Sequence, residues 1–218
     1  MKLQQFIDAN QEKDSTGDVF QLENTRLLDV AVDGMVWAKA GSMVAFTGDI
    51  SFKQKHGGVG KWLKKTVTGE GTLTMQATGR GHLYLADQGK RIHVLRLGEG
   101  ESISVNGSDV LAFEDSVAWD ITMMKKISGM ASGGLFNMQL TGPGMIAFGT
   151  HGNPLVLETP VVTDPMATVA WSTHTPPEFR TDLSVGSFLG KASGEEIQMD
   201  FQQAGGFVVV QPYEEGVG

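Results

Sequence analysis

The sequence predicts an all-β protein of antiparallel strands in packed sheets, a β-sandwich or double-stranded β-helix with little helix. Three observations predict this fold class. Apolar and polar residues alternate with a period of two along much of the chain, which is typical of strands with one buried face. Glycine is abundant, with 29 residues in 218, and this favours many turns and bulges. A motif returns after 63 residues, which indicates duplication of a β unit.

The repeated motif spans Leu73 to Gly81 and returns as Phe136 to Gly144. The two copies share a methionine, a glutamine, a threonine and two glycines at the same spacing. A weaker third copy, Met199 to Gly205, lies at twice the interval. The chain is therefore predicted to form one domain with three pseudo-repeats. The predicted domain spans residues 1–218, and the pseudo-repeats span about 22–70, 71–133 and 134–212.

Alternation and glycine turns place the strands in chain order. The expected strands are Val30 to Val36, Met43 to Phe46, Ile50 to Phe52, Leu73 to Ala77, Leu83 to Leu85 and Ile92 to Val94. Helical signals are sparse, and the best of them predicts one or two turns over Gly60 to Val67.

A hairpin is predicted around the turn Asp87 to Lys90. This loop would pair Leu85 with Ile92 and place apolar side chains on one face. The second copy predicts an equivalent hairpin, in which Met145 to Phe148 pairs with Leu155 to Leu157. These pairings follow from local spacing alone.

Composition excludes several classes of protein. The chain has no cysteine, so disulfides, thiolate metal sites and cysteine nucleophiles are excluded. Its formal charge of −8 disfavours nucleic acid as a partner, because such binding rests on Lys and Arg beside phosphates. We expect no transmembrane segment, signal peptide or transit peptide, and hence a location in the cytoplasm of a bacterium. Repeated units leave edge strands that need covering, which predicts a homo-oligomer.

Two histidines are the candidate metal ligands. On the predicted hairpin, His82 and His93 lie diagonally on one face, and Glu99 or Glu101 is the nearest third ligand. The alternative is a pair of exposed histidines on the polar face of two strands. The second copy has apolar residues at both positions, so the repeated unit does not need them, and no metal site is predicted.

No catalytic motif is found. The chain lacks a Gly-x-Ser-x-Gly elbow, and Gly57 to Lys61 lacks the spacing and strand–helix context of a phosphate loop. The glycine pairs of the repeat lie between strands, where turns or bulges explain them. The sequence therefore predicts no enzyme and no cofactor.

A basic stretch stands out in this acidic chain. Such a segment suits an anionic lipid surface, an acidic protein partner, or single-stranded RNA by stacking and charge. A solvated connecting loop is the competing interpretation. The candidate contact residues are Lys53, Lys55, Lys61, Trp62, Lys64 and Lys65.

The segment Trp37 to Gly48 resembles the signature of the altered inheritance of mitochondria protein twenty-four family. Thr68 to Gly71 and Leu140 to Gly144 are similar to two further glycine steps of that family, and the likeness runs from about Leu22 to Pro212. The resemblance implies a TRAP-like fold, that of the tryptophan RNA-binding attenuation protein, in an uncharacterised bacterial member. Mitochondrial members are associated with inner-membrane organisation. The residues by which TRAP-like rings bind RNA and tryptophan find no match here, and the family supplies no catalytic set.

Together these patterns predict a non-enzymatic β scaffold or binding protein, acting at a membrane surface or in a protein assembly. One alternative is a β-helix protein that binds a small molecule or metal through His82 and His93. A second is binding of single-stranded RNA by a TRAP-like oligomer.

Overall fold

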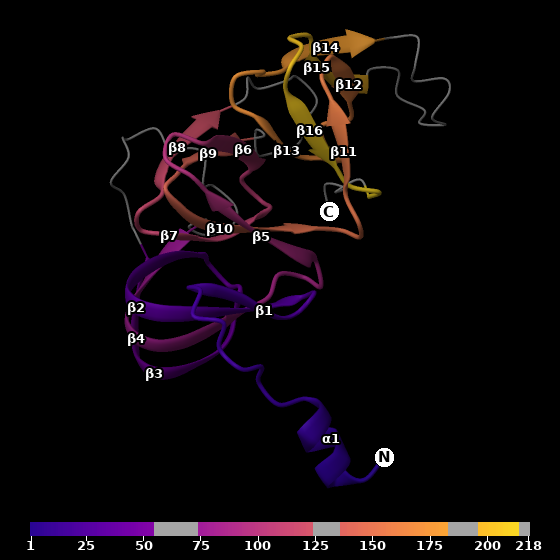
Figure 1. The fold of residues 1–218 in the computed structure, drawn as a ribbon. Coiled ribbons are helices and arrows are strands. Elements are labelled where there is room, and N and C mark those ends of the chain that lie inside the picture. Colours follow the sequence, from indigo (N-terminus) through magenta and orange to yellow (C-terminus); the bar gives the residue numbers. More distant parts are fainter. Residues whose placement is uncertain (55–73, 124–135, 183–195, 214–218) are drawn as a thin grey trace.

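The computed structural model describes residues 1–54, 74–123, 136–182 and 196–213. Within these ranges the chain forms sixteen strands and one short helix, which confirms the all-β prediction (Figure 1). Every strand pair is antiparallel. The helix predicted over Gly60 to Val67 lies outside the described residues.

The first sheet, sheet A, has seven strands in the order β3-β4-β2-β7-β10-β5, with β1 also paired to β2. The first half of β2 pairs with β1 and its second half with β7. The strands are β1 (Phe20–Asn24), β2 (Leu27–Lys39), β3 (Met43–Gln54), β4 (Thr74–Leu85), β5 (Arg91–Leu97), β7 (Val110–Glu114) and β10 (Gly144–Thr150).

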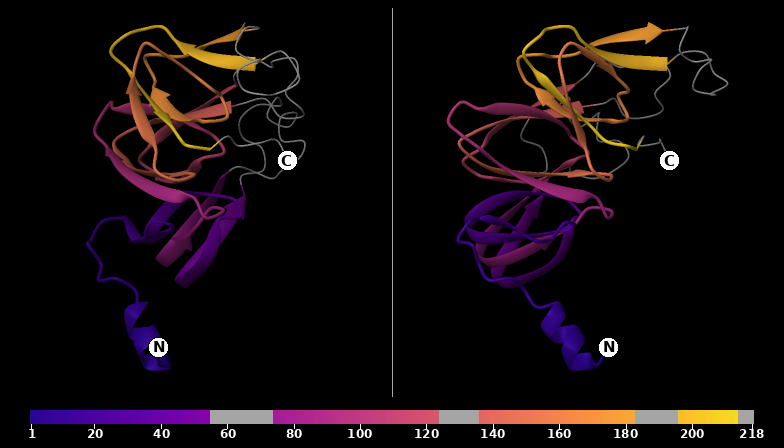
Figure 2. Two further views of the ribbon diagram at one scale, coloured as in Figure 1. Left: turned by 90° about the vertical axis from the view of Figure 1, so that its right-hand side faces the viewer. Right: turned by 45° about the vertical axis from the view of Figure 1, so that its right-hand side comes forward.

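Two further sheets stack on sheet A. Sheet B has the order β11-β16-β13-β6-β9-β8, and sheet C has the order β12-β15-β14. Sheet B contains β6 (Ser102–Asn106), β8 (Ala118–Met123), β9 (Phe136–Thr141), β11 (Leu155–Glu158), β13 (Thr168–Ser172) and β16 (Phe207–Val210). Sheet C contains β12 (Val161–Thr163), β14 (Glu178–Asp182) and β15 (Glu196–Phe201). Figure 2 shows the helix, α1 (Leu3–Ala9), standing apart from the sheets, and none of its residues is buried.

Three hydrophobic cores lie between these layers, and two of them share a wall. The first core fills the concave side of sheet A, and the second lies between sheets A and B. In β2, Val36 faces the first core and Trp37 faces the second. In β10, Ala147 faces the first core and Ile146 faces the second. We call β7, β10 and the second half of β2 the shared wall. The third core joins sheets B and C around Trp171.

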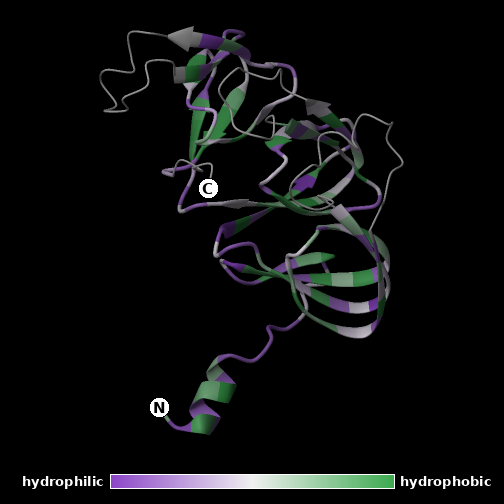
Figure 3. Cartoon of the chain, turned by 180° about the vertical axis from the view of Figure 1, so that it is seen from behind, coloured by the Kyte–Doolittle hydropathy of each residue, from purple (hydrophilic) through white to green (hydrophobic). Residues whose placement is uncertain are grey.

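Glycines let the long strands of sheet A bend around the first core. Gly48 of β3 lies opposite Gly81 of β4, and Gly34 of β2 lies opposite Gly79. At Gly81 φ is +154°, and a Cβ there would overlap the carbonyl oxygen of Thr47. Glycine therefore permits both the backbone conformation and the close approach of β3. Figure 3 shows alternating hydrophobic and hydrophilic bands along these curved strands.

The copies of the repeated motif form strands that pair in the same way but differ in whether the strand is continuous. In the first copy it forms one continuous strand, β4. In the second copy Pro143, which has no N–H, stands between the two glycines, and the strand divides into β9 of sheet B and β10 of sheet A. The third copy begins within β15 of sheet C and ends just before β16 of sheet B. The strand before each copy pairs with it, as β3 with β4, β8 with β9 and β14 with β15.

Both predicted hairpins are wrong. Leu85 pairs with Leu28 of β2 and Met43 of β3, so neither edge of β4 is free for β5. Strand β5 instead pairs with β10, where Ile92 lies opposite Gly149. Strand β11 pairs with β16 rather than with β10. The hydrophobic alternation was read correctly, but it does not specify which strand is the neighbour.

Two ion pairs hold the strand ends at one end of the shared wall. Lys39 closes β2, and its ammonium lies 2.7 Å from Asp87 and donates to the carbonyl of Ser108 at 2.6 Å. Lys90 precedes β5 and lies 2.5 Å from Asp109, which precedes β7. The Lys90–Asp109 pair is buried, with side-chain exposures of 3% and 1%. The loops that enter β5 and β7 are therefore tied to each other and to β2.

We expect Gly81→Ala to destabilise the fold more than Gly34→Ala. Both positions have positive φ, but a Cβ at Gly34 meets nothing within 4 Å. The conformational strain of Gly34→Ala should lower the free energy of unfolding by about 1–3 kcal/mol. Gly81→Ala adds steric overlap with β3, so its loss should be larger. Urea denaturation of both variants measures this, and equal losses would show that close approach of β3 is not the constraint.

Removing the cation of the buried pair should be strongly destabilising. Lys90→Met leaves the buried carboxylate of Asp109 without the ammonium beside it, and about 3 kcal/mol of stability should be lost. The double variant Lys90→Met/Asp109→Leu should lose less, because it also removes the charge that needs compensation. Thermal or urea unfolding of both variants tests this. A double variant at least as unstable as the single one would contradict it.

Candidate functional site

The first predicted site residue, His82, lies on the outer face of sheet A beside buried and acidic groups. Its Nδ1 is 3.0 Å from both carboxylate oxygens of Asp29 on the neighbouring strand β2. Burial raises the pKa of Asp29 above its ordinary value; the His82 contact opposes this rise, and the charges of Glu23 and Glu12 add to it. Tyr84 lies two residues further along β4, and its hydroxyl donates to Glu12 at 2.7 Å.

This cluster fastens the segment that precedes β1. Burial, followed by the hydrogen bond to Glu12, raises the pKa of Tyr84 well above its usual range, so its hydroxyl stays a donor. The adjacent Lys13 donates its backbone N–H to Glu23 at 2.9 Å and its ammonium to the carbonyl of Leu22 at 2.8 Å. Tyr84 therefore holds the N-terminal segment against β4, and the His82–Asp29 contact ties β4 to β2.

The second predicted residue, His93, is half-buried on β5. Its Nε2 lies 2.8 Å from the hydroxyl of Thr150, and its ring stacks on Phe148 with centroids 5.3 Å apart. Burial lowers the pKa of His93, and the positive charge of Arg91 lowers it further. The imidazole is therefore held in its neutral form.

The structure does not place His82 and His93 on adjacent strands. Strands β2, β7 and β10 stand between β4 and β5 in the order of sheet A. Of the two expected third ligands, Glu101 accepts a hydrogen bond from the backbone N–H of Gly98 at 2.6 Å. In the described part of the chain, no group of three or more His, Asp or Glu side chains could hold a metal ion. The metal hypothesis thus loses the hairpin on which it rested.

Of the predicted basic contact residues, the structure describes Lys53, which is exposed near the end of β3. Lys55, Lys61, Trp62, Lys64 and Lys65 lie outside the described residues. None of the described residues forms a helix with the length and apolar character needed to cross a bilayer.

The exposed edge of β3 is a feature that sequence reasoning did not single out. Among the described strands, β3 ends sheet A and pairs with β4 alone. Three apolar side chains near its start are exposed, at 43% for Met43, 61% for Val44 and 44% for Phe46. The ring of Phe46 meets that of Phe52 at 5.3 Å. The sequence does carry a signal for this edge, which is the unbroken apolar run Met43 to Phe46 after the turn at Gly41. A strand with one buried face alternates apolar and polar residues, so an unbroken run leaves some apolar side chains on the exposed face.

Comparisons with known proteins identify a family and a fold. The family model described as mitochondrial biogenesis AIM24 matches residues 20–213. A comparison with curated proteins finds no match. The crystal structure of protein SPYM3_0169 from Streptococcus pyogenes, a structural genomics target, is similar over 89% of this chain and 92% of its own, with a TM-score of 0.64 and 23% identity. At this identity the likeness shows the fold alone.

We expect stability to fall as the pH drops below 6.5, the ordinary pKa of histidine. The folded chain lowers the pKa of His93, so protonation in this range favours the unfolded state. The contribution of His93 is complete above pH 6.5 and is lost as the pH falls towards its lower folded pKa.

Urea midpoints at about pH 7.5 and about pH 5.5 measure this dependence. His93→Gln, which can still bond Thr150, should flatten it. His174→Gln is the matched control, since that ring is exposed, and it should leave the dependence unchanged. An unaltered pH dependence in His93→Gln would contradict the assignment.

Proposed function

This chain belongs to the mitochondrial biogenesis AIM24 family, and we propose that it is a non-enzymatic scaffold that assembles by pairing strand β3 with β3 of a second copy. The observation that carries the proposal is the open edge of this strand. One side of β3 is bonded to β4, and along the other side no described strand pairs with its backbone N–H and C=O groups. Such an edge is a ready template for another strand.

Strand β3 differs from the other terminal strands of the sheets. It has 12 residues, whereas β5 has 7, β8 has 6, β14 has 5, β11 has 4 and β12 has 3. It contains no proline, and its exposed apolar residues Met43, Val44 and Phe46 lie along the edge. Natural proteins protect long edges with charge, proline or covering segments. The start of β3 has neither charge nor proline, and no described segment covers it, so a partner strand better explains this apolar edge.

The charges of β3 favour a second copy of the same strand. Thr47, Asp49, Ser51 and Lys53 alternate with the inward-facing Ile50 and Phe52. In a two-fold antiparallel pair centred on Ser51, Asp49 of one copy lies opposite Lys53 of the other, and the symmetry makes this contact twice. Neither side chain has an ion pair with another described residue. A symmetric pair of this kind is the commonest form of homo-oligomer.

The perturbed titratable groups support a role without catalysis. Asp29 bonds His82 between β2 and β4, Tyr84 fastens the N-terminal segment through Glu12, and His93 bonds Thr150. Each perturbed group thus serves a contact within the fold, although strongly shifted pKa values often mark catalytic sites. A cytoplasmic location, and contact of the stretch from Lys53 to Lys65 with an anionic membrane or an acidic protein, stay predictions.

Charge reversal and its repair test the pairing. Asp49→Lys and Lys53→Asp each place like charges across the two-fold axis, so each should weaken dimerisation about tenfold. The double variant Asp49→Lys/Lys53→Asp restores opposite charges and should recover wild-type association. Sedimentation equilibrium over a range of protein concentrations measures the dimer dissociation constant.

Asp120→Lys supplies the matched control. Asp120 is an exposed aspartate on β8, the terminal strand of sheet B, so it undergoes the same charge change away from β3. It should leave association unchanged. A wild-type chain that stays monomeric, or a double variant weaker than both single variants, would overturn the proposal.

A further inference from the structure

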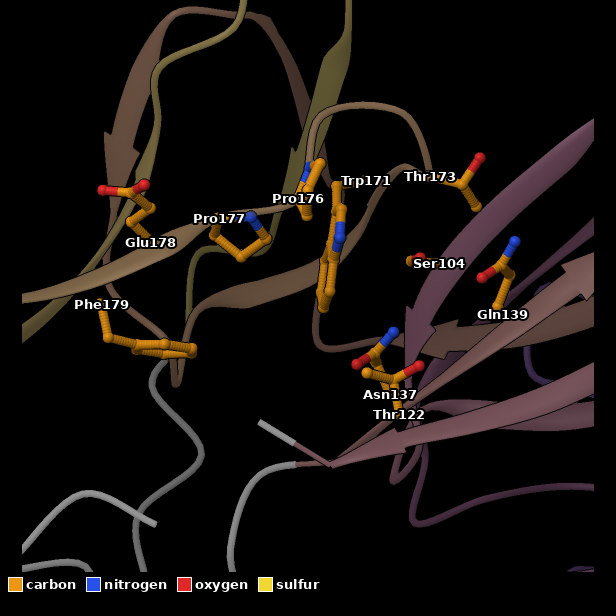
Figure 4. Close-up of a pocket in the computed structure, with 10 residues that line it drawn as sticks. All are labelled: Ser104, Thr122, Asn137, Gln139, Trp171, Thr173, Pro176, Pro177, Glu178 and Phe179. Atoms are coloured by element: carbon orange, nitrogen blue, oxygen red, sulfur yellow. The ribbon is translucent and has the colours of Figure 1, made fainter. Parts of the chain in front are cut away.

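A cavity of about 490 Å³ lies at the opposite end of the molecule from β3, between sheets B and C. Its volume falls in the range of about 300–1,000 Å³ that small-molecule sites occupy. Figure 4 shows the segment Pro176 to Phe179 on one side, the polar side chains of sheet B on the other, and the ring of Trp171 between them. Strands β6, β8, β9, β13 and β14 and the loop between β13 and β14 therefore contribute side chains to one space.

The polar side of the cavity is a regular product of the sheet register. Trp171 of β13 lies opposite Ser104 of β6, and Ser104 lies opposite Gln139 of β9. Asn137 of β9 lies opposite Thr122 of β8 in the next row. Sequence neighbours of these residues point into the second core, so the polar side chains of this side project from the far face of sheet B.

Four polar groups on this face form no hydrogen bond within the described chain. Ser104 is 4% exposed and Asn137 is 5% exposed, and neither side chain bonds another described residue. The amide of Gln139 and the indole N–H of Trp171 form no such bond either. None of these atoms is sealed from solvent, so they open onto the space of the cavity. Four hydrogen-bonding groups that no described residue uses therefore surround one space, which suits a ligand that bonds them.

We propose that this cavity binds a neutral saccharide unit. The hydroxyl of Ser104 and the amides of Asn137 and Gln139 can each donate and accept hydrogen bonds, as sugar hydroxyls do. The indole N–H of Trp171 adds a further donor. Among the described residues that line the cavity there is no Lys, Arg or His, and Glu178 is the one charged residue there, so an anionic ligand is disfavoured. Trp171, Pro177 and Phe179 supply an apolar wall for the C–H face of a sugar ring.

The cavity is built for binding rather than cleavage. Glycoside hydrolysis ordinarily uses two carboxyl groups that flank the bond, and the described lining has one. That residue, Glu178, is exposed and accepts a hydrogen bond from the side chain of Gln202 at 3.3 Å. The site therefore extends the scaffold function with recognition of a saccharide, and it does not depend on association through β3.

Nuclear magnetic resonance of the full chain tests the proposal. The Trp171 indole N–H signal, assigned by its loss in Trp171→Phe, and the side-chain amide signals of Asn137 report on the cavity. We titrate glucose, galactose, mannose and N-acetylglucosamine. At least one of them should shift both sets of signals saturably. The 6-phosphate of that sugar should bind about tenfold more weakly, because no lining cation compensates its charge.

Asn137→Leu separates binding from folding. It removes an amide that bonds no other described residue, so thermal stability should stay equal or rise, while sugar affinity should fall about tenfold or more. Gln203→Leu, which removes an exposed amide outside the cavity, should change neither. The proposal is overturned if no sugar moves the Trp171 and Asn137 signals, if the 6-phosphate binds as well, or if Asn137→Leu retains affinity.

Discussion

The shared wall between the first two cores is the constraint on which the rest of the structure depends. Strands β7 and β10 and the second half of β2 carry apolar side chains on both faces, so every residue there must suit one core or the other. Trp37 shows the consequence. Its ring lies 5.9 Å, centroid to centroid, from that of Phe113 on β7 of the same sheet, and 5.4 Å from that of Trp119 in sheet B. An aromatic cluster thereby joins the two sheets.

A doubly buried wall also creates a problem where its strands begin and end. Polar loops must approach the buried layer there, and an uncompensated polar group in such a place is destabilising. The pairs Lys39–Asp87 and Lys90–Asp109 answer this need, since each joins loops from different strands of sheet A. Lys39 belongs to the segment that resembles the family signature. That signature is therefore explained by folding, with its lysine bonding Asp87 and Ser108 and with Ser42 closing the turn through the carbonyl of Lys39.

The wall leaves binding surfaces at the two ends of the stack. Side chains in the middle are committed to packing, so free polar or apolar groups collect on β3 at one end and on the far face of sheet B at the other. The repeat contributes to both ends. Its first copy is the strand that holds β3, and its second copy supplies Asn137 and Gln139 to the cavity. The same unit thus supports an edge in one place and a recognition surface in another.

The sequence by itself determined the strand class, the repeat, the family resemblance and the inward side of most strands. These follow from local pattern, because alternation reports which face of a strand is buried. The structure alone decided which strands are neighbours. Leu85 has the alternation expected of a hairpin, but both edges of β4 are occupied, and β5 crosses to β10. Strand pairing depends on competition among strands that are distant in the chain, and the spacing of apolar residues within one segment carries no information about that competition. For the same reason His82 and His93 fell on separated strands, while Trp171, Ser104 and Asn137, far apart in the chain, came to line one cavity.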